Sequence, residues 1–294
     1  MMIAYAGPNL PHDLFDATGR NAGPLTWNID RAMPAADRWL ESKFAPWTRS
    51  VVQDWADGAL DHLEAVVFTR ADDSAQRLYY YLCELRRAGS IKGPEPLMLD
   101  IAKIARNSSV ARGEAALRKL GEGLGVDSAA LSAAIATGNA ARREATPAVA
   151  ATNPVCLIAG SPLPDDRMHA MIAQAGWSAT GRTLADEWAD RGPEVDETGD
   201  PFTALARQLH ARHLDTRGFY DRSAALAEQA RSIGAKAAVL WLIEEDDTTV
   251  WHLPAMRTVL EGLGLPVLVA TRRDWSCRDG IDTEIAAFLQ GVSA

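Results

Sequence analysis

Residues 65–89 are AVVFTRADDSAQRLYYYLCELRRAG, and this stretch predicts a buried strand, a sharp acidic turn and a helix. The apolar run at residues 65–68 is short and rich in β-branched side chains, as central strands of parallel sheets are. Asp73 is in position to cap the helix, and Gly89 is a typical residue to follow a helix end. We therefore expect Asp72 and Asp73 at the carboxyl end of a strand, where open α/β sheets bind their ligands.

Composition limits the class of protein. A chain of 294 residues with 47% hydrophobic and 23% charged residues is long enough for two ordinary α/β domains. The net charge of −9 argues against nucleic acid as a partner, because binding phosphates requires a basic surface. No apolar run is long enough for a signal peptide or a membrane span. Cys83, Cys156 and Cys277 are odd in number and far apart, which favours a reducing, cytoplasmic location.

Strand-like and helix-like segments alternate along the whole chain. This alternation predicts an α/β protein with two Rossmann-like (flavodoxin-like) parallel-sheet domains. Residues 146–154 show no periodicity and lie next to prolines, which indicates a linker. We expect an N-terminal α/β domain with helical elements at residues 1–147 and a C-terminal α/β domain at residues 153–294, facing an interdomain cleft. Residues 186–201 are acidic and rich in Gly and Pro, and predict a surface excursion.

A second acidic loop mirrors the first. Residues 244–247 (EEDD) follow the apolar run at residues 237–243. If both domains turn their strand ends toward one cleft, Asp72 and Asp246 approach each other there and form a catalytic pair for acid/base chemistry or hold a divalent cation. The pocket would be lined by Trp47, Asp73, Ser161 and Glu245. The alternative is that the carboxylates are solvated turn and helix-cap residues, and that the tryptophan belongs to the core.

The other candidate ligands are weaker. Cys83 and Cys156 lie within helix-like and strand-like patterns and are expected to be buried, whereas Cys277 lies in a polar segment and is expected to be exposed. His210 and His213 are three residues apart on an expected helix, but no neighbouring Cys or carboxylate completes a metal-binding set. We therefore predict no metal ligands among them.

Five motifs follow one another in a defined order. They are residues 11–19 (PHDLFDATG), 67–74 (VFTRADDS) followed by 77–79 (RLY), 158–163 (IAGSPL), 260–268 (LEGLGLPVL) and 283–288 (TEIAAF). In order and spacing the chain resembles the 2-hydroxyacyl-CoA dehydratase and benzoyl-CoA reductase family over nearly its whole length. The resemblance implies subunits built of two Rossmann-like α/β domains.

The resemblance also implies a 4Fe–4S cluster held by three cysteines near the domain interface. In that family the cluster takes an electron from an ATP-dependent activator and reduces an acyl-CoA. At the matching positions this chain has Asp72, Asp246 and either Trp47 or Thr48, and Glu284 replaces the arginine of the last helix. Carboxylates replace thiolates poorly as iron–sulfur ligands. We therefore expect no cofactor in this chain, and a cluster only in a partner subunit.

Three functions follow. The first is a cluster-free subunit that forms a heterodimer with a cluster-bearing homologue and lines part of the acyl-CoA pocket. The second is a stand-alone enzyme with a carboxylate or metal site at Asp72 and Asp246. The third is an iron–sulfur dehydratase or reductase with displaced ligands such as Cys83 and Cys277. We rank them in this order.

Overall fold

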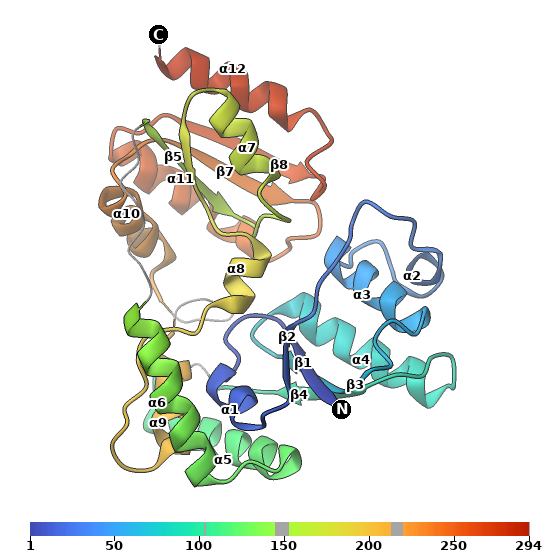
Figure 1. The fold of residues 1–294 in the computed structure, drawn as a ribbon. Coiled ribbons are helices and arrows are strands. Elements are labelled where there is room, and N and C mark those ends of the chain that lie inside the picture. The colour runs from blue at the N-terminus through green and yellow to red at the C-terminus, as the bar shows by residue number, and fades with distance from the viewer. Residues whose placement is uncertain (103, 145–152, 213–219, 294) are drawn as a thin grey trace. The chain divides into compact units, whose positions relative to one another are not determined.

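The computed structural model describes residues 1–102, 104–144, 153–212 and 220–293, which form a mixed α/β structure (Figure 1). Its strands belong to two separate four-stranded sheets, and every strand pairing is parallel. Helices flank both sheets. The predicted fold class, two Rossmann-like parallel-sheet units, is confirmed.

The first sheet has the spatial order β2-β1-β3-β4, with β1 (Met2–Ala6), β2 (Asn21–Pro24), β3 (Leu63–Thr69) and β4 (Glu95–Leu99). The central strands β1 and β3 are buried almost throughout, which explains their apolar sequences. The helices along this part of the chain are α1 (His12–Ala17), α2 (Pro34–Trp39), α3 (Pro46–Ala56), α4 (Asp73–Arg87), α5 (Asn107–Leu124) and α6 (Ser128–Glu144).

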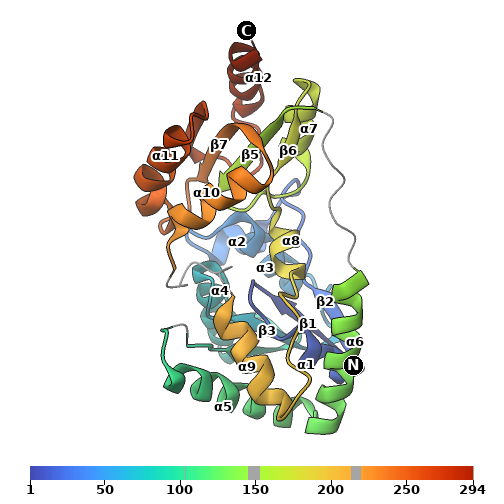
Figure 2. The same cartoon turned by 90° about the vertical axis from the view of Figure 1, so that its left-hand side faces the viewer.

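The second sheet repeats this order as β6-β5-β7-β8, with β5 (Val155–Gly160), β6 (Ser178–Thr180), β7 (Ala235–Ile243) and β8 (Val267–Arg273). The remaining helices are α7 (Arg167–Gln174), α8 (Leu184–Ala189), α9 (Pro201–Ala211), α10 (Arg222–Ser232), the 3-10 helix η1 (Thr249–His252), α11 (Leu253–Gly262) and α12 (Ile281–Ser293). Helices α10 and α11 cover one face of this sheet, and α7 and α12 cover the other (Figure 2).

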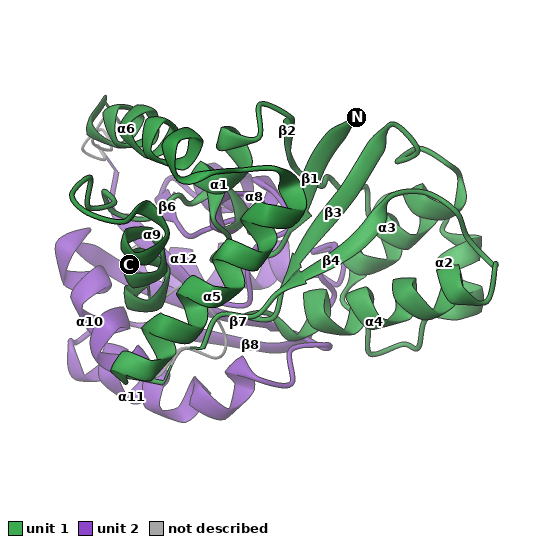
Figure 3. Cartoon of the chain, turned by 90° about the horizontal axis from the view of Figure 1, so that it is seen from below, with its two compact units in different colours: residues 1–147, 188–219 green, residues 148–187, 220–294 purple. Residues whose placement is uncertain are grey.

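Each of the two compact units is built from two separate stretches of the chain. Unit 1 comprises residues 1–147 and 188–219, and unit 2 comprises residues 148–187 and 220–294 (Figure 3). The contiguous division expected from the sequence assigns residues 188–212 to the second domain, whereas they pack with the first unit. The segment expected to be a linker, residues 146–154, lies outside the described residues except for its last two.

Helix α9 explains why the chain returns to unit 1. The helix begins after Asp200, whose carboxylate accepts a hydrogen bond from the Thr203 backbone N–H, and it has a proline at its first position. Its buried face contributes Phe202, Leu205 and Leu209 to the core formed by β1, α1, α5 and α6. In Figure 2 it lies beside α5 and α6. Without α9 this face of unit 1 would expose apolar side chains to water.

The segment before α9 is also part of this core, so the expected surface excursion is wrong in part. Trp188 is 1% exposed and Val195 is 2% exposed. The Trp188 ring packs edge-on against Trp27 and Trp47, and Asn139 binds the Val195 backbone through both its amide nitrogen and its amide oxygen. The acidic, Gly- and Pro-rich composition of this segment does not indicate that Trp188 and Val195 are buried.

Unit 2 has its own core. Leu157, Ala238, Leu240 and Leu242 of the sheet pack against the buried faces of α10 and α11. The closing helix α12 buries Ile281, Ile285 and Leu289, whose i, i+4 and i+8 spacing places them on one apolar face.

Candidate functional site

The loops after the first strand of each sheet have related sequences. After β1 the chain continues as GPNLPHD (residues 7–13), and from the last residue of β5 it continues as GSPLPDD (residues 160–166). Because the strand orders are the same, these loops occupy equivalent positions next to β3 and β7. Open parallel sheets bind ligands where the strand order reverses, outside the carboxyl ends of such strands. Each unit therefore has one candidate site.

In unit 2 the site is built on Gly160 and Ser161. Gly160 has φ +121°, and a Cβ there would overlap the Trp241 carbonyl oxygen, so only glycine allows β5 and β7 to approach so closely. The Ser161 side chain is consequently enclosed, with the residue 5% exposed. Its Oγ donates to Asp246 Oδ2 at 2.7 Å and accepts from the Ile243 backbone N–H at 3.2 Å.

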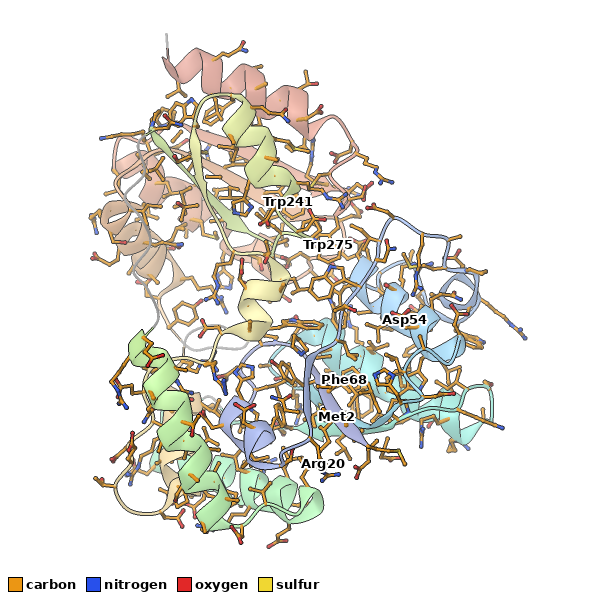
Figure 4. The ribbon with its side chains drawn as sticks, viewed as in Figure 1. Met2, Arg20, Asp54, Phe68, Trp241 and Trp275 are labelled. Atoms are coloured by element: carbon orange, nitrogen blue, oxygen red, sulfur yellow. The ribbon has the colours of Figure 1, made fainter. Side chains whose placement is uncertain are left out.

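Asp246 is held by three donors. Besides the Ser161 hydroxyl on Oδ2, its Oδ1 accepts the backbone N–H groups of Thr248 at 3.1 Å and Thr249 at 2.7 Å. The carboxylate thus fixes the turn that leads into η1. In the loop that carries Ser161, the Pro162 carbonyl accepts a hydrogen bond from the Trp275 indole N–H at 2.8 Å. Figure 4 labels Trp275 and Trp241 among the side chains of unit 2. Asp246 therefore stabilises a turn, because both of its carboxylate oxygens already accept hydrogen bonds.

In unit 1 the end of β1 approaches β3 as closely as β5 approaches β7 in unit 2. Gly7 has φ +112°, and a Cβ there would overlap Thr69 Cγ2 at the end of β3. Asp72 follows three residues later and caps α4, since its Oδ1 accepts from the Ala75 backbone N–H at 2.7 Å. The expected cap was Asp73, which is instead the first residue of the helix. The predicted capping chemistry is right, but the helix begins one residue earlier.

Of the residues expected to form one site, the structure brings Ser161 and Asp246 together. Asp72 belongs to unit 1 and Asp246 to unit 2, so their meeting at a cleft stays a prediction. Asp73 and Glu245 are half-buried in their respective loops. Trp47 is 4% exposed, and its ring packs edge-on against Trp188 with 4.9 Å between the ring centroids. It is therefore a core side chain, and its role in lining a pocket stays a prediction.

Sequence reasoning missed a buried charged cluster around α1, which we call the Asp13 cluster. Asp13, with its side chain 1% exposed, accepts two hydrogen bonds from Arg142 of α6, at 3.2 and 2.7 Å. Arg191 approaches Asp13 to 3.7 Å and also pairs with Asp16. Arg212, at the end of α9, pairs with Asp190 at 3.3 Å. The cluster ties α1 to α6 and to the segment that returns from unit 2.

His12 lies beside this cluster in a neutral form. Burial, followed by the nearby positive charges of Arg212 and Arg191, lowers the pKa of His12 to about 3. Its Nε2 donates to the Trp188 carbonyl at 2.9 Å, since a carbonyl can only accept, so Nδ1 carries the lone pair. Within the described residues Nδ1 has no hydrogen-bond partner. At 4% exposure the imidazole is out of reach of a substrate in solution, and we assign it a structural role.

One sequence signal could have revealed the Asp13 cluster. His12 and Asp13 follow directly on the loop after β1, at the carboxyl end of a central strand, where polar residues deserve the same consideration as Asp72. Their partners Arg142, Arg191 and Arg212 lie more than a hundred residues away, and nothing in a single sequence pairs them.

The three cysteines are in environments that disfavour metal binding. Cys156 is buried, as expected, whereas Cys277 is 5% exposed and not on the surface as predicted. It lies in a tight loop at φ +56°, where its Sγ faces the Trp275 carbonyl. Burial raises the pKa of both thiols to about 12 and also raises the pKa of Cys83, which is half-buried. Metals bind the thiolate form, which these environments disfavour.

In the described part of the chain no three His, Cys, Asp or Glu side chains gather closely enough to hold a metal ion. His210 contacts the Ile104 carbonyl at 3.0 Å, and His213 lies outside the described residues. None of the helices between residues 1 and 293, as far as they are described, has the length and apolar composition needed to cross a bilayer. No family model and no curated protein sequence matches this chain.

The capping roles of Asp72 and Asp246 are testable by substitution. We expect Asp72→Ala and Asp246→Ala each to lower the free energy of unfolding by about 1 kcal/mol, because backbone N–H groups lose their acceptor. Asp72→Asn and Asp246→Asn should cost less, since Asn caps helices nearly as well as Asp. Urea denaturation measures these differences. Asn variants as unstable as the Ala variants, together with stabilisation of the native chain alone by Mg²⁺ or Ca²⁺, would instead support a cation site.

Proposed function

We propose that the chain is a cluster-free subunit of a complex resembling the 2-hydroxyacyl-CoA dehydratases and benzoyl-CoA reductases. In this proposal it forms a heterodimer with a homologous subunit that bears the iron–sulfur cluster. One observation carries the proposal: the two loops where the resemblance implies thiolate ligands carry Asp72 and Asp246 instead. Both carboxylates are engaged in holding local turns. This use of the carboxylates supports a chain without a cluster of its own.

The residues of this chain do not fit an iron–sulfur cluster. A cluster needs soft thiolate ligands, and the three cysteines are buried or half-buried with raised pKa values. Cys156 belongs to the central strand β5, so its ligation would require the core to open. These facts argue against the reading with displaced ligands, and we derive no reaction step through a cluster in this chain.

The stand-alone enzyme is less well supported. A hard cation at Asp246 would compete with the Ser161 hydroxyl and with two backbone N–H groups for the same two oxygens. Asp246 accepts the Ser161 hydroxyl as a general base would, but Ser161 is 5% exposed and its Oγ also accepts the Ile243 N–H, so the hydroxyl is closed to a substrate in solution. Neither feature supplies a nucleophile or a metal centre of its own.

An exposed tryptophan supports an interaction role. Trp251 is 83% exposed and its neighbour Val250 is 40% exposed, in the 3-10 helix η1 that Asp246 helps to fix. Large aromatic side chains are enriched at the centres of protein interfaces. The turn therefore presents an apolar side chain at the carboxyl end of β7, where a partner subunit could bury it. In this proposal the partner supplies the cluster, the ATP-dependent activator acts on the partner, and the complex works in the reducing cytoplasm on an acyl-CoA.

Co-expression tests this association. The chain and a cluster-bearing homologue from the same genome should co-purify as a heterodimer, and Trp251→Ala should weaken the complex at least about 30-fold, the factor for a 2 kcal/mol interface residue. Tyr80→Ala is the matched control, because Tyr80 is also an exposed aromatic, at 53%, but lies on α4. If light scattering gives the chain the same molar mass with and without the homologue, the proposed function is wrong. Equal losses for both variants would mean that η1 is not the contact.

A further inference from the structure

His12 binds the returning segment of unit 1 at the point where that segment enters the unit. The chain re-enters unit 1 at Trp188, which lies in the last turn of α8. The last carbonyl oxygens of a helix have no partner within it. The Trp188 carbonyl accepts a hydrogen bond from His12 Nε2 at 2.9 Å. Because His12 is the first residue of α1, this bond ties α1 to the first residue of the returning segment.

Side-chain contacts, and not backbone pairing between strands, hold the rest of this segment. Residues 190–200 are all described, and they form no helix or strand. The Arg191 carbonyl accepts a hydrogen bond from Arg142 at 3.1 Å. The Val195 N–H donates to the amide oxygen of Asn139 at 2.9 Å. A segment that is held by few contacts opens locally, at a lower free energy than the whole unit.

Such an opening would end at α9. This helix begins at Pro201, and its side chains Phe202, Leu205 and Leu209 are buried in the core of unit 1. Residues 188–195 can therefore leave α1 while α9 stays packed against the sheet and its helices.

The groups around the His12 imidazole provide no acceptor for a second proton. Within the described residues Nδ1 has no hydrogen-bond partner, and His12 is 4% exposed. Tyr5 of β1 lies beside the ring, with 5.0 Å between the ring centroids, and burial raises the pKa of its hydroxyl to about 12. The charged neighbours are already paired with one another: Asp13 of α1 with Arg142 of α6, Asp16 of α1 with Arg191, and Asp190 with Arg212 at the end of α9. A proton on Nδ1 would add an uncompensated positive charge to a buried site.

Acid therefore favours an opened form in which His12 is in water. Burial, followed by the charges of Arg212 and Arg191, lowers the pKa of His12 from 6.5 to about 3 in the closed form. In water the pKa returns to about 6.5. The closed form keeps its full stability above about pH 6.5, and it loses stability as the pH falls toward about 3, because only the opened form takes up the proton.

We propose that His12 is an acid-sensitive latch, whose protonation at Nδ1 in mildly acidic solution releases residues 188–195 from α1 while the sheet of unit 1 stays folded. The proton comes from the solvent, and no covalent bond changes. Since the chain passes from unit 2 to unit 1 between Glu187 and Trp188, the release lengthens the connection between the units. The inference does not rest on the proposed function, because His12 and its charged neighbours all belong to unit 1.

Hydrogen exchange at about pH 7 and about pH 5, corrected for the intrinsic exchange rate, measures the opening. Peptides that cover residues 188–195 should exchange faster than β3 at both pH values, because the segment opens without the sheet. Their protection should fall about 25-fold from pH 7 to pH 5, the ratio that a histidine pKa of about 6.5 in the opened form gives. Both pH values lie above the usual carboxylate range, so a histidine is the group that responds.

Two matched variants assign the effect to His12. His12→Gln keeps an N–H donor for the Trp188 carbonyl but does not titrate, so the protection of residues 188–195 should change less than about 3-fold between the two pH values. His62→Gln is the control, because His62 also contacts a backbone carbonyl, that of Ala59 at 3.0 Å, but is exposed. This control should keep the change of about 25-fold.

Circular dichroism identifies a variant that fails to fold. If His12→Gln does so, the imidazole nitrogen chemical shifts of the native chain carry the test, and His12 should stay neutral with its proton on Nε2 at about pH 5. Equal protection of residues 188–195 and β3 overturns the proposal, because release then requires unfolding of the whole unit. The proposal also fails if folded His12→Gln keeps the pH dependence, if His62→Gln loses it, or if His12 titrates near pH 6.5 in the folded chain.

Discussion

Asp13→Ala is expected to lower the free energy of unfolding of unit 1 by about 3–5 kcal/mol. Asp13 and Arg142 have side chains 1% and 7% exposed, so removing the carboxylate leaves a buried guanidinium without its partner. Arg142 would keep its hydrogen bonds to Asn139 and to the Arg191 carbonyl, but these groups carry no compensating negative charge. Urea denaturation followed by circular dichroism measures the loss.

Glu64→Ala is the matched control for Asp13→Ala. Glu64 also pairs with an arginine, Arg20, but the two side chains are 43% and 33% exposed. Exposed ion pairs contribute about 0–1 kcal/mol, so the control should stay near the native stability. If Asp13→Ala is as mild as Glu64→Ala, the Asp13 cluster does not hold unit 1 together.

Trp188→Ala is expected to have a similarly large effect, about 3–5 kcal/mol, because it empties a well-packed site. The Trp188 indole is 1% exposed, with its ring centroid 5.1 Å from that of Trp27 and 4.9 Å from that of Trp47. Its backbone carbonyl also accepts the His12 hydrogen bond. The loss should appear as faster hydrogen exchange in β1 and α1, with β5 and β7 unchanged.

Trp251→Ala controls for the loss of a tryptophan as such. At 83% exposure its removal should change the free energy of unfolding by less than about 0.5 kcal/mol. If Trp188→Ala instead accelerates exchange in β5 and β7 while sparing β1, then residues 188–212 do not belong to unit 1.

The elements of the fold were predictable because local pattern decides them. Residues 65–89 form β3 and α4 as expected, since a β-branched run and a helical apolar stripe both face the core. Gly89 has φ +70°, the conformation expected for a residue that ends a helix. The strand is longer than the expected run at residues 65–68, and the helix start shifted by one residue because Asp72 and Asp73 are chemically equal as caps.

The path of the chain between the units was not predictable from local pattern. Residues 186–200 carry the composition of a surface loop, and their burial depends on two side chains, Trp188 and Val195. Their contacts are with Trp27, Trp47 and Asn139, at separations along the chain that periodicity does not report. Long-range packing outweighed composition in this segment.

The positions of the two acidic loops were predictable, but the roles of their carboxylates were not. Parallel topology puts Asp72 and Asp246 at strand ends, and they lie there. Whether a carboxylate at such an end caps a turn or binds a ligand depends on which backbone N–H groups face it, and a sequence does not contain that geometry. The turn into η1 and the enclosed Ser161 hydroxyl became evident only from the hydrogen bonds.

Iron and sulfide analysis of the anaerobically purified chain tests the cluster-free role most directly. We expect a colourless protein without stoichiometric iron or sulfide when the chain is purified alone, because Asp72 and Asp246 cap turns and the three thiols are buried or half-buried. A broad absorption near about 400 nm, where thiolate-to-iron charge transfer occurs, together with stoichiometric iron and sulfide in the isolated chain, would contradict it.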